Sequence, residues 1–460
     1  MNEINNKGRN DKIHSFSGHF LYSLGAVPSS LPYNVVQSFL IYFYTLTAGL
    51  SLGGAGLLLL LYGIWNAIND PLIGYYMDKW KFEKWGRRIP YIIIGTIPFT
   101  IGFMGLWWVP WNEQIGIFLH GFIMLFLFDF GFTLAMTAWS ALYTEMYEEE
   151  KERASVVALK DFIAFFSGMI GLLLPPLFAE ALGWPLTGVI LGITIPITMY
   201  LSLLGTRERK EYQIDEPLPV LKAFKESFTN KPFVVITLTY TMIDFFSGLT
   251  LTVLPLYARF ILNMDEGSVG FAAIGFALGI IASIPFWRWI YAKKGPKYGL
   301  LLAIGIFVLA VWPLFLVNDF MSLLLLSLIP GVGSGGMIMT EPAISAAIDY
   351  DEIKTGRRRE ATFTGILAFV ARLSMVLSGL TLIIVQFLTG FDSSADIQPP
   401  EAEFGLRALV SLVPVIGGSL ALLFFKFFPL NYVKFMEQQE QLKILHQERL
   451  DKLERLREEE

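Results

Sequence analysis

The sequence has no cysteine, few histidines and few charged residues. The absence of cysteine among its 460 residues excludes disulfide bonds and thiol catalysis, without indicating a compartment. The charged fraction is 16% and the formal net charge is −5, which is too small to indicate a charged partner, and no basic region suits nucleic acid. We find no serine–histidine–acid set, phosphate-binding glycine loop or metal-ligand cluster, and the lone His120 receives no role. An enzyme, a cofactor and a bound metal are therefore not expected.

Hydrophobic residues make up 54% of the chain, aromatic residues 15%, and the mean hydropathy is +0.54. A water-soluble domain could not bury that much apolar surface, so the sequence predicts an all-α integral membrane protein in a lipid bilayer. The first fifteen residues are polar, and we expect no removable signal peptide. Apolar runs of about 20 residues predict twelve transmembrane helices, near 16–46, 52–77, 90–109, 115–142, 154–180, 185–205, 232–262, 268–292, 298–317, 320–348, 361–389 and 405–428.

Lysine and arginine gather in alternate loops, which the positive-inside rule places in the cytoplasm. Both termini are then cytoplasmic, and the number of spans is even. The stretch 206–231 carries Pro217, Pro219 and many charges, and it separates two groups of six spans. We expect five regions: a cytoplasmic segment 1–15, a six-helix bundle 16–205, a linker 206–231, a second six-helix bundle 232–428, and a charged cytoplasmic helix 429–460.

The second span places polar residues deep in an apolar helix. Asn66, Asn69 and Asp70 lie within it, and an acid at the bilayer centre costs about 2.5–3.5 kcal/mol on insertion scales. Pro71 lacks an amide donor, so the carbonyl of Ala67 is left free as a further oxygen ligand. These oxygens at one depth predict a cation-binding site. A polar cluster that only packs helices together is the alternative.

The fourth span has a polar face. Asp129, Thr133, Thr137 and Ser140 recur at helical spacing, and Trp139 lies beside them. An indole ring can stack on a sugar while carboxylates accept hydroxyl hydrogen bonds, so this face is a candidate solute pocket. Ordinary helix or lipid packing of Trp139 is an equally good interpretation.

Several motifs resemble a known transporter family. Gly74-x-x-x-Asp78-Lys79, followed by Gly86-Arg87-Arg88, resembles the loop signature of the major facilitator superfamily. The segments 64–74 and 349–360 together, with Ser140-Ala141-Leu142-x-x-Glu145 and Glu152-Arg153, resemble the glycoside–pentoside–hexuronide:cation symporters, the melibiose permease group. The resemblance covers both halves of the chain. It implies the major facilitator fold and cation-coupled transport, and the group also contains sodium-dependent lysophospholipid carriers.

The resemblance implies particular ligands. The group's sodium site has two aspartates and an asparagine on span two and a threonine on span four, and the matching residues here are Asn66, Asn69, Asp70 and Thr133. One carboxylate is missing, which weakens sodium relative to a proton, so the coupling ion stays open. A basic residue of span eleven matches Arg372, whose candidate partners are Asp70, Asp129, Asp244 and Glu341. The group's sugar-binding acids and arginine are replaced by Ser30, Met136 and Asp161, so melibiose itself is not expected.

We therefore predict a monomeric symporter of a sugar or glycoside in the cell membrane, coupled to sodium or protons. A lysophospholipid carrier on the same fold and a receptor without transport are the alternatives. The expected solute-binding residues are Asp129, Thr137, Trp139, Ser140, Asp244 and Arg372. The expected cytoplasmic gating ion pairs involve Asp78, Arg87, Arg88, Glu145, Arg153, Asp349, Glu352 and Arg358.

Overall fold

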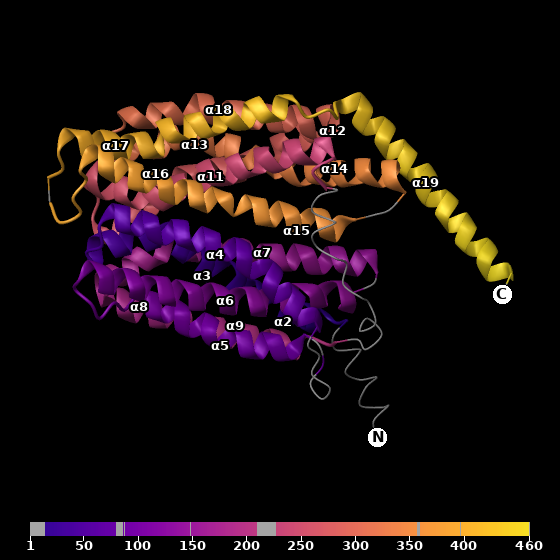
Figure 1. Ribbon diagram of the computed structural model, residues 1–460, viewed down its shortest axis with the longest axis horizontal. Coiled ribbons are helices and arrows are strands. Elements are labelled where there is room, and N and C mark those ends of the chain that lie inside the picture. Colours follow the sequence, from indigo (N-terminus) through magenta and orange to yellow (C-terminus); the bar gives the residue numbers. More distant parts are fainter. Residues whose placement is uncertain are drawn as a thin grey trace, which may run out of the picture. The chain divides into compact units, whose positions relative to one another are not determined.

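The structure is a computed structural model that describes residues 14–79, 86, 88–147, 149–208, 227–356, 359–395 and 397–459. Side chains within these ranges are described except at 75, 78, 79, 144, 145, 150, 361 and 449–459. The regular elements of these residues are all helices, which Figure 1 labels. The prediction of an all-α fold is confirmed.

The helices have the following bounds. In the first part of the chain they are α2 (Phe16–Ser23), α3 (Ala26–Tyr42), η1 (Phe43–Thr47), α4 (Leu52–Lys79), α5 (Ile89–Leu106), α6 (Gln114–Met146), α7 (Glu150–Leu182), α8 (Trp184–Gly192) and α9 (Thr194–Leu204). After the linker they are α11 (Lys231–Phe260), η3 (Glu266–Ala273), α12 (Ile274–Val311), η4 (Trp312–Leu316), α13 (Phe320–Gly336), η5 (Met337–Met339), α14 (Thr340–Thr355), α15 (Glu360–Ala371), α16 (Leu373–Thr389), α17 (Pro400–Val410), α18 (Leu412–Lys426) and α19 (Tyr432–Glu459).

Ten helical stretches of the described residues are long and apolar enough to cross a membrane. One of them, Glu266–Leu316, contains a kink at Gly295, where φ is 72° and ψ is 177°, a conformation that a residue with a Cβ rarely adopts. This kink lies where the sequence predicts a loop between two spans. The expected first span, 16–46, comprises α2, α3 and η1, and α3 continues directly into η1, so 26–47 is a helical run long enough for one crossing. The multi-pass membrane fold is confirmed, and the number twelve stays a prediction.

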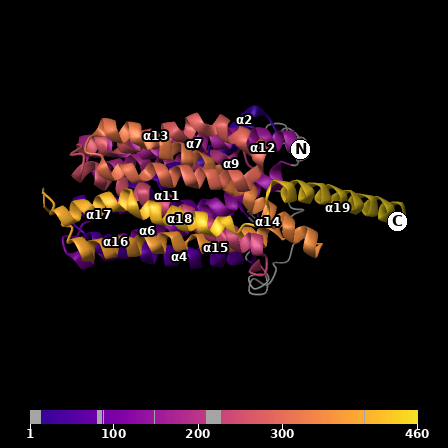
Figure 2. The ribbon, with the colours of Figure 1, turned by 90° about the horizontal axis from the view of Figure 1, so that it is seen from above.

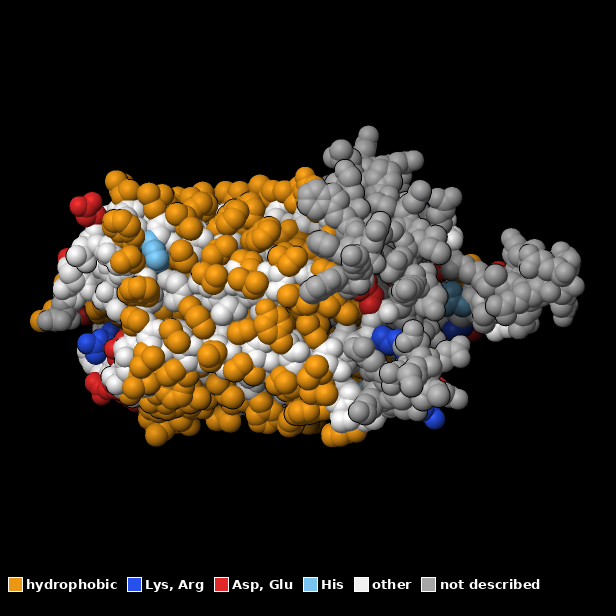
Figure 3. All heavy atoms as spheres, turned by 90° about the horizontal axis from the view of Figure 1, so that it is seen from below, with side chains coloured by type: hydrophobic (Ala, Val, Ile, Leu, Met, Phe, Trp, Pro, Cys, Tyr) orange, Lys and Arg blue, Asp and Glu red, His pale blue; other side chains and the backbone are white. Residues whose placement is uncertain are grey.

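The exposed surface of these helices is apolar. On α5, Ile94, Ile97 and Ile101 are each about half exposed, and on α6 Ile115 is 73% exposed. Figure 3 shows a broad band of hydrophobic side chains, with acidic and basic side chains toward its two ends. A soluble monomer rarely exposes so large an apolar patch, and a helix in lipid must expose one. The exposed face is therefore suited to contact with the acyl chains of a bilayer.

The chain divides into two compact units, each described here by itself. Unit 1 comprises Met1–Pro217, Leu251–Ala273 and Met375–Leu406, and unit 2 comprises Leu218–Thr250, Ile274–Ser374 and Arg407–Glu460. Unit 1 thus contains α4 together with the main part of α16. The two helices approach closely, since a Cβ at Gly56 would lie 2.8 Å from the carbonyl oxygen of Gly379. The division into two six-helix halves stays a prediction.

One buried core cluster of unit 1 packs against the C-terminal half of α6. Leu134, Ala138, Trp139 and Leu142 belong to one buried hydrophobic cluster with Tyr22 of α2. This packing fixes the rotation of α6 about its axis. The polar residues on the other side of α6 are thereby directed toward α4, which contacts α6.

Candidate functional site

A cluster of polar side chains joins α4 and α6. On α4, Asn66, Asn69 and Asp70 share a face because residues three and four positions apart lie above one another on a helix. On α6, Asp129 and Thr133 are four residues apart for the same reason. We call these five residues, together with Tyr62 of α4, the α4–α6 cluster.

Asp129 is the hydrogen-bond acceptor at the centre of this cluster. Its Oδ1 accepts hydrogen bonds from Nδ2 of Asn66 at 2.8 Å and from the hydroxyl of Tyr62 at 3.1 Å. Its Oδ2 accepts from Nδ2 of Asn69 at 2.9 Å. These donors are uncharged, so they orient and solvate the carboxylate without cancelling its charge.

Asp70 joins the same network through Thr133. The Thr133 hydroxyl donates to Oδ1 of Asp70 at 3.0 Å and accepts from Nδ2 of Asn69 at 3.2 Å. The residues predicted as cation ligands, Asn66, Asn69, Asp70 and Thr133, are therefore brought together by the fold. Their role as ligands stays a prediction.

The cluster is shielded from solvent and holds an unused acceptor. Asn66 is 3% exposed, Asp129 1% and Thr133 6%, whereas Asp70 is partly exposed. Oδ1 of Asn66 is buried and has no hydrogen-bond partner among the described residues. A buried acceptor left without a partner costs about 1–3 kcal/mol. Coordination of a hard cation by this amide oxygen would recover that cost.

A cavity of about 430 Å³ lies elsewhere in unit 1. Its lining residues are Ala26, Ser29, Met136, Thr137, Trp139, Ser140, Lys160, Asp161 and Ala164. Thr137, Trp139 and Ser140 were predicted to bind solute, and the fold places them together there. Asp129 was predicted with them but lies in the α4–α6 cluster. Sequence periodicity gave no signal for Lys160 as a cavity residue beyond its position inside an apolar span.

Trp139 is mainly a packing residue that also lines this cavity. Its ring stacks on Tyr22 with centroids 4.9 Å apart and planes inclined by 15°, and it is 4% exposed. It also covers Gly25, where a Cβ would lie 2.3 Å from the indole. The ring thus serves the packing alternative, while its position on the cavity wall leaves contact with a solute open.

Lys160 and Asp161 place opposite charges on the cavity wall. Their side chains are 3.9 Å apart, with the aspartate 65% exposed. An exposed pair of this kind contributes about 0–1 kcal/mol to stability. Its two charges are consequently available to a polar ligand at little cost.

The predicted solute residues of the second half lie together in unit 2. Asp244 is on α11 and accepts a hydrogen bond from the hydroxyl of Ser374 at the start of α16. Arg372, at the junction of α15 and α16, is close enough to Asp244 for their charges to interact. Asp244 is thus one of the partners predicted for Arg372. Their role in solute binding stays a prediction.

Among the predicted gating residues of unit 1, Arg88 and Arg153 have described side chains. The backbone amide of Arg88 donates to the carboxylate of Glu208 at 2.9 Å, and Nε of Arg153 donates to the carbonyl of Tyr147. Beside them, burial raises the pKa of Tyr147, and the negative charge of Glu152 raises it further. Predicted partners Asp78, Arg87 and Glu145 lie outside the described residues or have undescribed side chains.

The predicted gating acids of unit 2 contact the C-terminal helix α19. Glu352 is fully buried, and its Oε1 lies 3.1 Å from Nε2 of His446. Oδ2 of Asp349 accepts a hydrogen bond from Gln439 at 3.4 Å. Arg358 lies outside the described residues.

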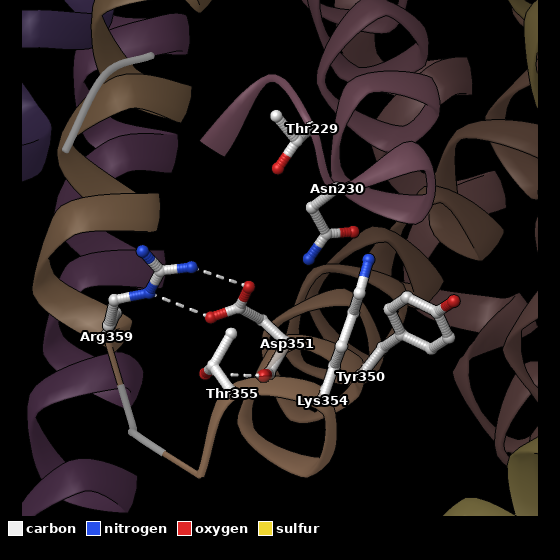
Figure 4. Close-up of a pocket in the computed structure, with 7 residues that line it drawn as sticks. All are labelled: Thr229, Asn230, Tyr350, Asp351, Lys354, Thr355 and Arg359. Atoms are coloured by element: carbon white, nitrogen blue, oxygen red, sulfur yellow. Dashed lines mark hydrogen bonds and ion pairs between the residues drawn. The ribbon is translucent and has the colours of Figure 1, made fainter. Parts of the chain in front are cut away.

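Sequence reasoning missed the ion pair between Asp351 and Arg359. Its hydrogen bonds are 2.7 and 2.9 Å long, and Figure 4 shows the guanidinium facing the carboxylate directly. Both residues line a cavity of about 410 Å³. Gly356 ends α14 with φ of 68°, a left-handed cap after which Arg359 lies against Asp351 of the same helix. Both residues lay in the acidic-basic run 349–360, which was the available signal.

The comparisons with known proteins decide the family. The family model described as MFS/sugar transport protein matches residues 21–432. The chain belongs to this family. As a member of it, the protein is a multi-pass membrane transporter.

Its relatives are similar along nearly their whole length. The uncharacterized symporter YnaJ of Bacillus subtilis (strain 168) is 27% identical, over 90% of this chain and 92% of its own. The glucuronide carrier protein homolog of Escherichia coli (strain K12) is 24% identical over 90% and 93%. The sodium-dependent lysophosphatidylcholine symporter 1 of Gallus gallus is 24% identical over 93% and 89%.

Solved structures share the fold. A bacterial homologue of the human lysosomal transporter Spinster aligns with a TM-score of 0.65 at 16% identity, covering 91% of this chain and 96% of its own. The nucleoside transporter NupG aligns with a TM-score of 0.64 at 14% identity, covering 90% and 100%. At these identities the likeness supports the transporter fold.

Proposed function

We propose that this transporter couples the uptake of a sugar or glycoside to the inward movement of a cation, by alternating access across the cell membrane. The observation that carries the proposal is the α4–α6 cluster, in which a carboxylate and an unpartnered amide oxygen are buried at membrane depth. A helix that only needed to pack would not retain such costly groups. Relatives named as a glucuronide carrier homolog and an isoprimeverose transporter support the solute class.

In this proposal the cation binds at Asp70 with oxygen ligands from Asn66, Asn69 and Thr133. Sodium would be coordinated directly by these oxygens, whereas a proton would reside on the carboxyl group of Asp70. The bound cation stabilises the loaded transporter. Solute and cation must then raise each other's affinity by the same factor, because the coupling free energy is reciprocal.

The cavity of unit 1 is the proposed part of the solute site in the first half of the chain. Its hydroxyls on Thr137 and Ser140 can bond a sugar, and its volume of about 430 Å³ suits one or a few sugar rings. Lys160 and Asp161 provide one charge of each sign. Lys160 in particular could pair with the carboxylate of an acidic glycoside. We therefore favour a neutral or acidic glycoside, or a monosaccharide.

The basic loops are proposed to face the cytoplasm, as the positive-inside rule predicts. The charged clusters of Glu152 with His14 and His19 and of Asp351 with Arg359 would then control the cytoplasmic opening. A cysteine placed at the exposed Lys151, before the predicted span 154–180, should react with a membrane-impermeant maleimide only in inside-out vesicles. Labelling in right-side-out cells would contradict this orientation.

A lysophospholipid carrier is the second candidate, since relatives carry the name of sodium-dependent lysophosphatidylcholine symporter. Calorimetric titration of the purified protein distinguishes the two. A panel of neutral sugars, uronides and lysophosphatidylcholine should be tested with and without sodium, at two pH values. We expect a sugar or uronide response that strengthens with the coupling ion. Lysophosphatidylcholine binding without any sugar response would overturn the proposal.

A further inference from the structure

The cation site implied by the sequence lacks one carboxylate on α4, where Asn66 stands. We propose that Asp129 of α6 supplies this second negative charge, so that Asp70 and Asp129 together hold a sodium ion. This inference rests on the proposed cation-coupled function and deepens it. It moves Asp129 from the predicted solute pocket into the cation site.

The first observation is the position of Asp129. Its Oδ1 is 2.8 Å from Nδ2 of Asn66, so the two side chains meet end to end. An asparagine and an aspartate have nearly the same shape. The amide at 66 and the carboxylate at 129 could therefore exchange places with little change in packing, and the negative charge would move by about one hydrogen-bond length.

The second observation is how the amides are oriented. Nδ2 of Asn66 and Nδ2 of Asn69 both donate to the Asp129 carboxylate. With its NH₂ group held there, Asn66 must direct its Oδ1 elsewhere, and this oxygen is buried without a partner among the described residues. Amide carbonyl oxygen is a ligand of hard cations and not of anions. By holding the NH₂ group of Asn66, Asp129 leaves Oδ1 of Asn66 available as a cation ligand, in addition to supplying charge.

The third observation links both acids. Asn69 bridges Oδ2 of Asp129 and Oγ1 of Thr133, and Thr133 donates to Asp70. The two carboxylates therefore belong to one hydrogen-bonded network. A cation bound at Asp70 would be attracted by the charge of Asp129 at short range, in surroundings of low dielectric where that attraction is strong.

The donors that α4 directs at Asp129 are neutral groups. Tyr62, Asn66 and Asn69 carry no charge, so their hydrogen bonds leave the negative charge of the carboxylate in place. The site then carries the same pair of carboxylates as the family pattern, divided between two helices. This charge, with several oxygen ligands, favours sodium over a proton.

The test is sodium binding to the full-length protein in detergent, with sodium chloride as the probe and choline chloride as the salt control. Calorimetry and the sodium-dependent rise in thermal unfolding temperature measure the affinity without any solute. We expect Asp129→Asn to weaken sodium binding about 10- to 100-fold. Asp319→Asn is the matched control, because Asp319 is an exposed helix cap at the start of α13 and asparagine caps equally well. It should bind sodium as the parent does.

The exchange variant Asn66→Asp/Asp129→Asn separates charge from packing. Restoring the carboxylate on α4 should return sodium affinity to within a few-fold of the parent. If Asp129→Asn binds sodium as well as the parent, the inference is wrong. If the single variant is weak and the exchange variant is no better, although both unfold at the parent's temperature, the second negative charge is not what sodium binding requires and the inference is also overturned.

The parent separates this inference from the proposed function. A parent that shows no response to sodium overturns the sodium site itself. A parent that binds sodium but no sugar or glycoside contradicts the proposed solute while leaving the assignment of Asp129 intact.

Discussion

Two polar clusters in this molecule hold buried acids in opposite ways. In the α4–α6 cluster of unit 1, the Asp129 carboxylate accepts hydrogen bonds from a phenol and two amides. In the α14–α19 cluster of unit 2, defined by Asp349, Asp351, Glu352, Arg359 and His446, Asp351 pairs with Arg359 and Glu352 contacts His446. A hydrogen bond from a neutral donor does not cancel the charge of a carboxylate, whereas a guanidinium does. The first cluster is therefore suited to binding a cation, and the second is suited to holding neighbouring segments of unit 2 together.

The location of the second cluster fits that distinction. Figure 2 shows α19 leaving the helices of unit 2 beside α14. Its Gln438 is buried and donates to the carbonyl of Ala346 at 2.7 Å, and His446 contacts the fully buried Glu352. The C-terminal helix is thus attached to α14 through side chains that sequence analysis treated only as part of a charged tail.

The largest effect should come from removing the acid that binds the ion. Asp70→Asn should abolish gradient-driven accumulation of solute in proteoliposomes, because no carboxylate remains on α4 within the cluster. The protein should still insert and unfold near the parent's temperature, since asparagine keeps the hydrogen bond from Thr133. Undiminished accumulation would show that the α4–α6 cluster is only structural.

The next effect concerns stability. Arg359→Ala should lower the free energy of unfolding by about 3 kcal/mol, because Asp351 is 5% exposed and would become a buried charge without its bidentate partner. Thermal unfolding in detergent measures the loss. Lys354→Ala is the control, because Lys354 lies on the wall of the same cavity. Arg407→Lys in the same unit is not suitable, since Arg407 donates hydrogen bonds to three groups. If both variants lose the same stability, the ion pair is not the cause.

Sodium affinity should be unchanged in Arg359→Ala. The comparison between the clusters requires that the ion pair of unit 2 contribute to structure and not to the cation site. A loss of sodium affinity as large as that in Asp129→Asn would break the comparison.

A smaller effect is expected at the attachment of α19. Gln438→Ala removes the buried donor to Ala346 and should cost about 1 kcal/mol of local stability, or roughly a fivefold faster amide exchange in α19. Hydrogen exchange followed by mass spectrometry measures it. Glu440→Ala, at an exposed position of the same helix, is the control. Equal exchange in both variants would show that α19 is not held through Gln438.

The smallest effect should be that of one neutral donor. Tyr62→Phe removes the hydroxyl that bonds Asp129 and should weaken sodium binding about threefold to tenfold, the net value of one typical hydrogen bond. In the Asp129→Asn background the same change should have less effect, because its charged acceptor is gone. Additive effects in the double variant would show that Tyr62 acts independently of Asp129.

The sequence alone determined the membrane class, the helical fold and the acids within it. Apolar runs long enough to cross a bilayer leave few alternatives, because backbone groups in lipid must bond within a helix. It also determined that Asn66, Asn69 and Asp70 share one face, since helical spacing is a property of the single helix. The acidic-basic run 349–360 indicated ion pairs, but not that Asp351 and Arg359 form one.

Only the tertiary structure decided what each face meets. Asp129 shares a face of α6 with Ser140, yet the two are about 16 Å apart along the helix, so one contacts α4 and the other lines a cavity. Likewise, the left-handed turn at Gly356 and the packing of α14 decide that Arg359 reaches Asp351. Periodicity gives the direction of a side chain from its own helix axis. Which neighbour lies in that direction, and at what depth, depends on how the helices pack.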